Sequence, residues 1–244
     1  MKKIIKTNYI ILILFGLLIF SACSKDDYYE DGGLAEAKFD GSILDYLDSK
    51  PVLFDTIAEI IRLAGLEETF TTDEFTFFAP SDPDIKQLIG SVDKGGLNRE
   101  LYYLGLDTIT KLSDIEPQIW ASHLLKYMFL GKNKLADYSQ VDFNLMNIHA
   151  GQNYISLSGE VSNIGVVFHD AIGGGSVLKY MGYRQLYLSY YFDTSNPDSF
   201  LSYPISTSDI QPNNGIIHVL NYNFTNFGLD LGATITADVI QSKR

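Results

Sequence analysis

The chain has 244 residues, a formal net charge of −12 and an apolar share of 46%. That share is enough to bury a core, so the composition excludes a disordered, collagenous or low-complexity chain, and the length suits one large domain or two small ones. An acidic chain without clustered lysine and arginine repels a phosphate backbone, which argues against nucleic acid as a partner. A chain with one cysteine forms no internal disulfide.

The amino terminus predicts secretion. Three lysines within the first six residues form a positive region, Tyr9 to Phe20 are apolar, and the small residues Ser21-Ala22 come directly before Cys23. This pattern is typical of a signal peptide and too short to span a bilayer comfortably. Except for Phe20, where leucine is usual, it resembles the lipobox of bacterial lipoproteins. The resemblance implies cleavage of residues 1–22 and lipid (palmitate) on Cys23; an ordinary signal with an incidental cysteine is the alternative.

Residues 23–40 are expected to form an acidic, flexible tether, because the stretch is polar and contains Gly32-Gly33. Lys25-Asp26-Asp27 resembles the export signal of surface lipoproteins in Bacteroidetes-type bacteria, although a solvated spacer without an address fits equally. A lipid on Cys23 would anchor the protein to a membrane that it does not cross. We therefore expect a surface-exposed protein on the outer membrane of a bacterial cell envelope.

The first half of the remaining chain predicts helices. Pro51 to Gly65 carries apolar residues at helical spacing between an initial proline and a final glycine. Thr76 to Pro80 is predicted as a buried strand, followed by a helix through Ile89 that Ser81 or Asp82 caps. Residues 90–113 are predicted as an insertion with some helix. A further helix over Ile115 to Tyr127 is expected to end at Gly131.

The second half predicts strands. Apolar residues there follow a period of two, which is typical of strands. The expected strands are Val141–Ile148, Tyr154–Leu157, Val166–His169, Val177–Tyr180, Gln185–Phe192 and Ile216–Leu220. Helices followed by strands indicate the α+β fold class.

Two segments about 130 residues apart carry a family resemblance. Phe75–Asp82 reads F-T-F-F-A-P-S-D, and Ser208–Leu220 contains D-I followed by N-G-I-I-H-V-L. Both resemble conserved boxes of the fasciclin-like domain family, and Leu124–Gly131 takes the place of a third. The structural motif residues are Phe77, Ala79, Pro80, Asp209, Asn214, Gly215 and His218.

The resemblance implies a fasciclin-like domain over residues 41–229, with N-terminal helices packed on a β-sandwich or wedge of two small sheets. Residues 90–113 and 173–203 would be insertions, the second an aromatic β-hairpin. Residues 230–244 would form a tail or an added strand.

The motif residues also have a physical interpretation. Asn214-Gly215 favours a turn with positive φ that leads into a core strand. Asp209 is expected to accept N–H bonds around that turn. His218 stands among apolar residues, where a core histidine that bonds a backbone carbonyl is favoured over a ligand or base. Lys126 and Tyr127 occupy the place of a Tyr-His pair that, in animal members of the family, is associated with adhesion.

No motif predicts catalysis. The four histidines are 20 or more residues apart, so none forms a paired metal-ligand spacing, and no metal or cofactor is expected. His123 lies four residues before Tyr127, and packing is its expected role. Asp82 and Asp84 flank a proline at a helix start, where capping is favoured over acid–base work. We expect a protein that is not an enzyme.

The tyrosines provide the candidate ligand-binding residues. On a strand, Tyr183, Tyr187 and Tyr191 share one face at about 13 Å intervals, while Leu186 and Leu188 face the core. Flat aromatic rings with polar tips suit sugar rings or a protein partner, and cross-strand aromatic pairing is the structural alternative. The expected function is lipid-anchored adhesion or binding of an extracellular protein or glycan; the alternative is capture of a polysaccharide for uptake.

Overall fold

The computed structural model describes residues 37–193, 195–196, 199–221 and 227–244. The expected signal peptide, the lipid site at Cys23 and most of the expected tether lie outside these residues. Ala37–Arg244 cluster as one unit with a continuous hydrophobic core.

Helices dominate the first half. The elements are α2 (Ile43–Asp48), α3 (Pro51–Leu63), α4 (Glu67–Thr72), β1 (Phe75–Ala79), α5 (Asp82–Ile89), α6 (Leu97–Tyr103), η2 (Leu112–Asp114), α7 (Pro117–Leu124), η3 (Leu125–Tyr127) and β2 (Met128–Leu130). Helix α3 begins at Pro51 and buries its apolar stripe, and Ser81 and Asp84 form a capping box at the start of α5. The predictions for α3, β1 and α5 are confirmed.

Strands dominate the second half. They are β3 (Gln152–Ile155), β4 (Val161–Phe168), β5 (Ala171–Gly173), β6 (Ser176–Leu178), β7 (Arg184–Tyr191), β8 (Phe200–Ile210) and β9 (Gly215–Leu220), with η4 (Leu135–Asp137) before them and α8 (Ala233–Ser242) after them. This order confirms a fold that contains both helices and sheet. The strands β3 to β9 include two, β5 and β8, that no sequence pattern predicted.

Seven strands form one sheet in the order β2-β1-β9-β8-β7-β4-β3, and β5 pairs with β6 separately. Only the β1–β9 pair is parallel among these ladders. The sheet nearly closes, because its two edge strands approach each other. Phe129 of β2 bridges Ser156, the residue after β3, and the N–H of Leu157 donates to the carbonyl oxygen of Met128 at 2.8 Å. The expected two small sheets are therefore one sheet, in which the long strand β8 belongs to both halves.

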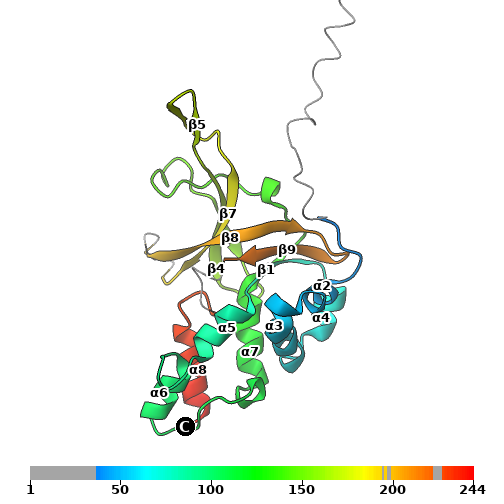
Figure 1. Cartoon of the computed structure of the whole chain (residues 1–244), viewed down its shortest axis with the longest axis vertical. Helices are drawn as coiled ribbons and strands as arrows, with labels where there is room; N and C mark the ends of the chain where they lie inside the picture. The colour runs from blue at the N-terminus through cyan, green and yellow to red at the C-terminus, as the bar shows by residue number, and fades with distance from the viewer. Residues whose placement is uncertain (1–36, 194, 197–198, 222–226) are drawn as a thin grey trace, which may run out of the picture. The chain divides into compact units, whose positions relative to one another are not determined.

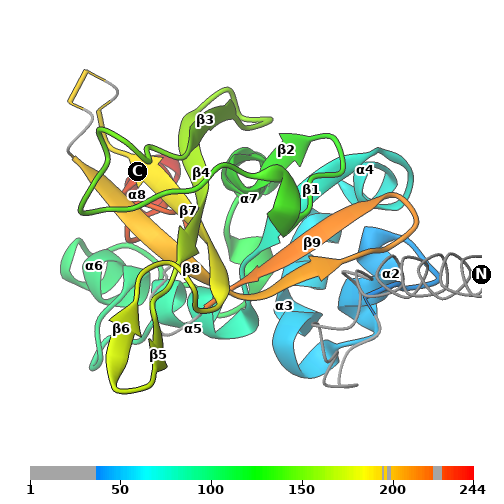
Figure 2. The same cartoon turned by 90° about the horizontal axis from the view of Figure 1, so that it is seen from above.

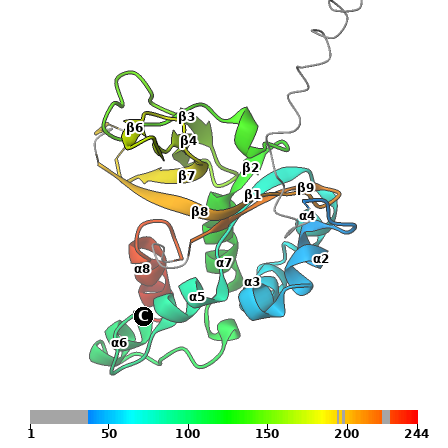
Figure 3. The ribbon, with the colours of Figure 1, turned by 45° about the horizontal axis from the view of Figure 1, so that its top comes forward.

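The core lies between this sheet and the helices. Helices α3, α5, α7 and α8 lie on one side of β8 and β9 (Figures 1 and 3). Phe54 of α3, Trp120 of α7 and Phe77 of β1 are among the largest fully buried side chains. This packing of helices on one face of the sheet leaves the opposite face of β3, β4 and β7 for other contacts.

Two local predictions were wrong. The helix at 115–127 ends at Tyr127 and not at Gly131, since Met128–Leu130 pair with β1 as strand β2. Residues 141–148 form no strand, because the Asp142 carboxylate accepts the N–H of Asn144 at 2.9 Å and closes a turn.

Residues 173–203 are not an inserted hairpin. The small hairpin β5–β6 projects from the domain (Figures 1 and 2), but β7 and the start of β8 lie in the middle of the seven-stranded sheet. Leu186 and Leu188 are buried there, and Tyr203 is 2% exposed. Removing residues 173–203 would remove part of the core.

Both boundaries of the domain differ from the expected ones. Residues 230–244 neither add a strand nor trail free: α8 packs against α7 and buries Ile235 and Val239. At the other end, Lys38 bridges Gln211, and the Phe39 ring packs edge-on against Tyr46 at 5.3 Å. The packed region therefore begins near residue 37, before the expected end of the tether at residue 40.

Candidate binding surface

The fold brings the two motif boxes together as neighbouring strands. Strand β1 pairs in parallel with β9, so that Phe75 faces Gly215 and Phe78 faces His218. At Gly215 a Cβ atom would lie 2.3 Å from the carbonyl oxygen of Phe75. This close approach, and not the positive φ expected for Asn214-Gly215, explains the glycine, since neither residue has a positive φ.

His218 lies fully inside the core. Its Nε2 contacts the carbonyl oxygen of Asn133 at 3.0 Å, and its Nδ1 accepts the N–H of Asp209 at 3.3 Å. Burial lowers the pKa of His218 to about 4, although the Asn133 carbonyl and the Asp209 carboxylate, 3.9 Å away, both act to raise it. The ring is therefore neutral at pH 7 and its two nitrogens are both engaged.

Asn214 and Asp209 connect the motif to distant backbone. The Asn214 side chain accepts the N–H of Ile43 at 2.8 Å and donates to the carbonyl oxygens of Phe70 and Asp73. The Asp209 carboxylate accepts the N–H of Leu135 at 2.7 Å, and not an N–H around the Asn214-Gly215 turn as expected. Asp209 has a positive φ of 65°, which turns its side chain toward η4.

The other motif residues are also buried. Phe77 and Ala79 of β1 are inaccessible to solvent, and Pro80 follows them into the interior. Of the two nearby carboxylates, Asp84 closes the capping box of α5, and Asp82 accepts the N–H groups of Thr56 and Ile57 in α3. The contact of Asp84 agrees with the capping interpretation, whereas Asp82 joins α5 to α3 instead of capping its own helix.

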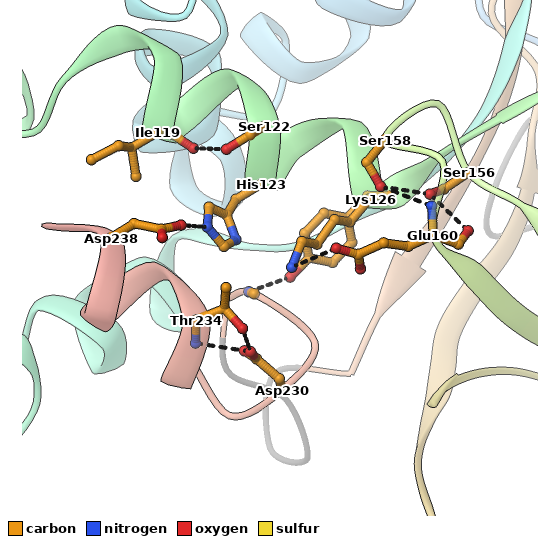
Figure 4. Close-up of polar contacts among 12 residues, drawn as sticks. Ile119, Ser122, His123, Lys126, Ser156, Ser158, Glu160, Asp230, Thr234 and Asp238 are labelled. Atoms are coloured by element: carbon orange, nitrogen blue, oxygen red, sulfur yellow. Dashed lines mark hydrogen bonds and ion pairs between the residues drawn. The ribbon is translucent and has the colours of Figure 1, made fainter. Parts of the chain in front are cut away.

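The residues that replace the Tyr-His pair, Lys126 and Tyr127, are both buried; Figure 4 shows Lys126 beside Glu160. Lys126 is 4% exposed, with its Nζ 3.2 Å from the Glu160 carboxylate and 5.6 Å from the centre of the Tyr190 ring. The buried Tyr127 hydroxyl accepts the N–H of Gly228 at 2.7 Å. Desolvation raises the pKa of Tyr127. Neither side chain is available to a partner at the surface.

His123 joins α7 to α8 (Figure 4). Its Nε2 lies 2.8 Å from the Asp238 carboxylate, and the ring is 1% exposed. Burial lowers the pKa of His123, which leaves a neutral ring that donates to Asp238, and its buried Nδ1 has no hydrogen-bond partner. This contact fits the expected packing role.

Within the described part of the chain, no group of three His, Cys, Asp or Glu side chains is arranged to hold a metal ion. A search of the same residues finds no helix with the length and apolar character needed to cross a membrane.

The three candidate tyrosines occupy different environments. Tyr183 precedes β7, is 66% exposed, and stacks on His169 with ring centroids 4.0 Å apart. Tyr187 and Tyr191 are half-buried on the outer face of β7, while Leu186 and Leu188 point into the core. The alternation of the strand is as predicted, but Tyr183 stands apart from the other two.

Two phenylalanines complete a row of aromatic rings on this face. The ring centre of Phe143 is 5.3 Å from that of Tyr187 and 6.0 Å from that of Phe200. The ring centres of Phe200 and Tyr191 are 5.9 Å apart. Phe200 belongs to the aromatic-rich stretch around β7 but was not among the candidate binding residues, and sequence reasoning missed Phe143. The register that sets Phe200 opposite Tyr191 would have identified one of them, but it depends on the pairing of β7 with β8.

The projecting β5–β6 hairpin exposes apolar side chains. Ile172 is 85% exposed and pairs in register with Val177, which is 61% exposed. Met181, just beyond the hairpin, is 70% exposed. We call Ile172, Val177, Leu178 and Met181 the hairpin surface; apolar surface gathered in this way is characteristic of interaction sites.

Comparisons with known proteins show a similarity among solved structures alone. The sequence matches no protein-family profile and no curated protein. Among solved structures, the chain is similar to a FAS1 domain pair from the insect cell adhesion molecule fasciclin I, at 15% identity and a TM-score of 0.45. The match covers 75% of this chain and 50% of the other, so this chain spans about half the length of that structure.

Proposed function

We propose that the chain is a non-enzymatic, lipid-anchored binding protein that mediates adhesion at a bacterial cell surface through one fasciclin-like domain. The parallel pairing of the two motif boxes supports the family assignment, because residues about 130 positions apart resemble the family and become adjacent strands. The buried, fully bonded His218 supports a structural role for the motif. In the fasciclin-like fold that we propose, the sheet forms a wedge, and strand β8 belongs to both halves of it.

The observation that supports adhesion is the hairpin surface. Ile172 and Val177 belong to a separate two-stranded sheet, so the core does not need their apolar side chains. Their exposure to water does not stabilise the monomer. Burying them against a partner would stabilise a complex by about 25 cal/mol for each Å² of apolar surface removed from water. The partner that we propose is an extracellular protein.

Adhesion of cells to beads coated with the protein tests this function. The double variant Ile172→Ser/Val177→Ser should lose adhesion, because it removes apolar contact area without affecting the core. The control is Val52→Ser, which alters an 88% exposed valine on α3. Equal adhesion by the wild type and the hairpin variant would contradict the proposed surface.

Lipid anchoring at Cys23 has its own test. With a labelled palmitate precursor, the wild type should carry label and sediment with membranes, whereas Cys23→Ser should remain unlabelled and be released. Palmitate label on the Cys23→Ser variant would exclude Cys23 as the site of lipid attachment.

The second candidate function is capture of a polysaccharide for uptake. The aromatic row on the outer face of β7 favours it, since Tyr191 and Phe200 are accessible rings on a rigid sheet. Native electrophoresis through gels that contain polysaccharides tests it, because binding retards the protein.

A further inference from the structure

A groove lies beside the aromatic row on the outer face of β3, β4 and the β7–β8 pair. Its volume is about 460 Å³, within the range of about 300–1,000 Å³ that is usual for small-ligand sites. The residues that line it and matter most are Met146, Asn147, Asn153, Asn163, Tyr191 and Phe200.

Every residue that lines the groove is uncharged. The chain as a whole carries 30 acidic and 18 basic residues, so a lining without charge is unlike the composition of the protein. An anionic ligand would require lysine or arginine, and a cationic ligand would favour carboxylates. The groove therefore suits a neutral ligand.

The aromatic rings of the groove are held in place by packing against one another and against Phe143. Phe200 packs against Tyr191 at 5.9 Å and against Phe143 at 6.0 Å, and Phe143 in turn packs against Tyr187. Rings fixed in this way lose little conformational entropy when a ligand binds. Their flat faces suit the C–H surface of a sugar ring.

The polar side of the groove consists of carboxamides in a fixed arrangement. The buried Asn163 donates to Asn153 Oδ1 at 2.9 Å and to the Ala150 carbonyl oxygen at 3.0 Å, which holds the exposed Asn153 side chain by its oxygen. At Gly151 a Cβ atom would lie 2.5 Å from Asn163 Oδ1, so this packing requires glycine. Gln152 pairs with the buried Ile164, so its side chain lies on the other face of β3. Asn147, exposed in the loop before β3, supplies a further carboxamide to the lining.

We propose that this groove binds an uncharged oligosaccharide, with sugar rings on Tyr191 and Phe200 and hydroxyl groups on Asn147 and Asn153. A carboxamide both donates and accepts hydrogen bonds, as a sugar hydroxyl does, and so the two are complementary without charge. This inference rests on the proposed capture of polysaccharide and names the ligand class and site for it. Tyr183 and Tyr187 are outside the lining.

Affinity electrophoresis of residues 24–244, which retain the whole unit Ala37–Arg244, tests the groove. The gels contain dextran, laminarin, xylan, galactomannan or the acidic alginate. At least one neutral polysaccharide should retard the wild type, and alginate should not. Tyr191→Ala and Asn147→Ala should each weaken that binding by about tenfold or more, the effect of losing about 1.4 kcal/mol.

The controls are Tyr183→Ala, an exposed tyrosine outside the groove, and Gln118→Ala, an exposed glutamine on α7; both should bind as the wild type does. Asn147 is exposed, so the loss of its side chain should not unfold the protein, and thermal melting checks this for Tyr191→Ala.

Retardation that survives both groove substitutions would overturn the groove and leave polysaccharide capture standing. No retardation by any neutral polysaccharide would overturn both, and adhesion through the hairpin surface would be unaffected. Retardation by alginate alone would overturn the neutral ligand.

Discussion

His218 illustrates what a single residue contributes to this fold. Its imidazole lies in the core with both nitrogens bonded, between Asn133 and the backbone of Asp209. The ring centre is 5.0 Å from Phe78 on the neighbouring strand β1. A charged ring there would lose its hydration without gaining a full ion pair, so the folded state keeps it neutral.

Acid should therefore destabilise the protein before its carboxylates are protonated. The ordinary pKa of histidine is 6.5 and that of folded His218 is about 4, so from pH 6.5 to 4 the unfolded chain binds a proton that the folded chain does not. The free energy of unfolding should fall in this window by up to about 3 kcal/mol. His123, whose pKa is also lowered, adds to the fall. Urea denaturation at several pH values measures it.

The matched variant is His218→Gln, which keeps a side-chain amide for the Asn133 carbonyl but does not titrate. It should be less stable at pH 7 and should show a smaller fall between pH 6.5 and 4. An unchanged slope in this variant would mean that His218 is not the neutral buried group.

At the scale of elements, Asp82 joins two helices. It stands at the start of α5, yet its carboxylate accepts the N–H groups of Thr56 and Ile57 in α3, and Asp82 itself is 4% exposed. Asp82→Ala should lower the free energy of unfolding by about 1–3 kcal/mol, because two N–H groups lose their acceptor. Asp82→Asn retains an acceptor oxygen and should cost less. Equal losses in the two variants, measured by chemical denaturation, would contradict this role.

Helix α8 completes the core rather than ending the chain loosely. Ile235 is fully buried between α8 and the rest of the domain, and Asp238 contacts His123. Ile235→Ala should lower the free energy of unfolding by about 2–5 kcal/mol, the usual cost of a cavity in a core. Gln241→Ala, on an exposed position of the same helix, should change it by less than about 0.5 kcal/mol. Thermal and urea melts compare them.

At the scale of the whole molecule, β7 and β8 hold the two halves of the sheet together. Strand β8 pairs with β9 in one half and with β7 in the other. A chain without residues 173–203 should fail to fold, because both connections are lost. Replacing Ile172–Val177 by two glycines shortens only the separate hairpin and should leave the melting temperature unchanged. Circular dichroism distinguishes these outcomes, and a folded 173–203 deletion would contradict the role of β7 and β8.

The sequence by itself determined the elements whose signals are local. Pro51 and the apolar stripe of α3, the aromatic run of β1, and the cap of α5 at Ser81 lie within a few residues of the elements that they define. Periodicity and capping act over such distances, which is why these elements follow from the sequence. The alternation of Leu186 and Leu188 with Tyr187 and Tyr191 was predictable for the same reason.

The tertiary structure alone decided what depends on distant pairing. Strand β8 escaped prediction because Pro204 interrupts its pattern and two register shifts break its alternation against β9. The aromatic row needs Phe143 from a loop and Phe200 from β8, and the carboxamides of the groove come from other segments again. Residues so far apart become neighbours only when β3, β4, β7 and β8 pair in their observed register, and no local pattern records that pairing.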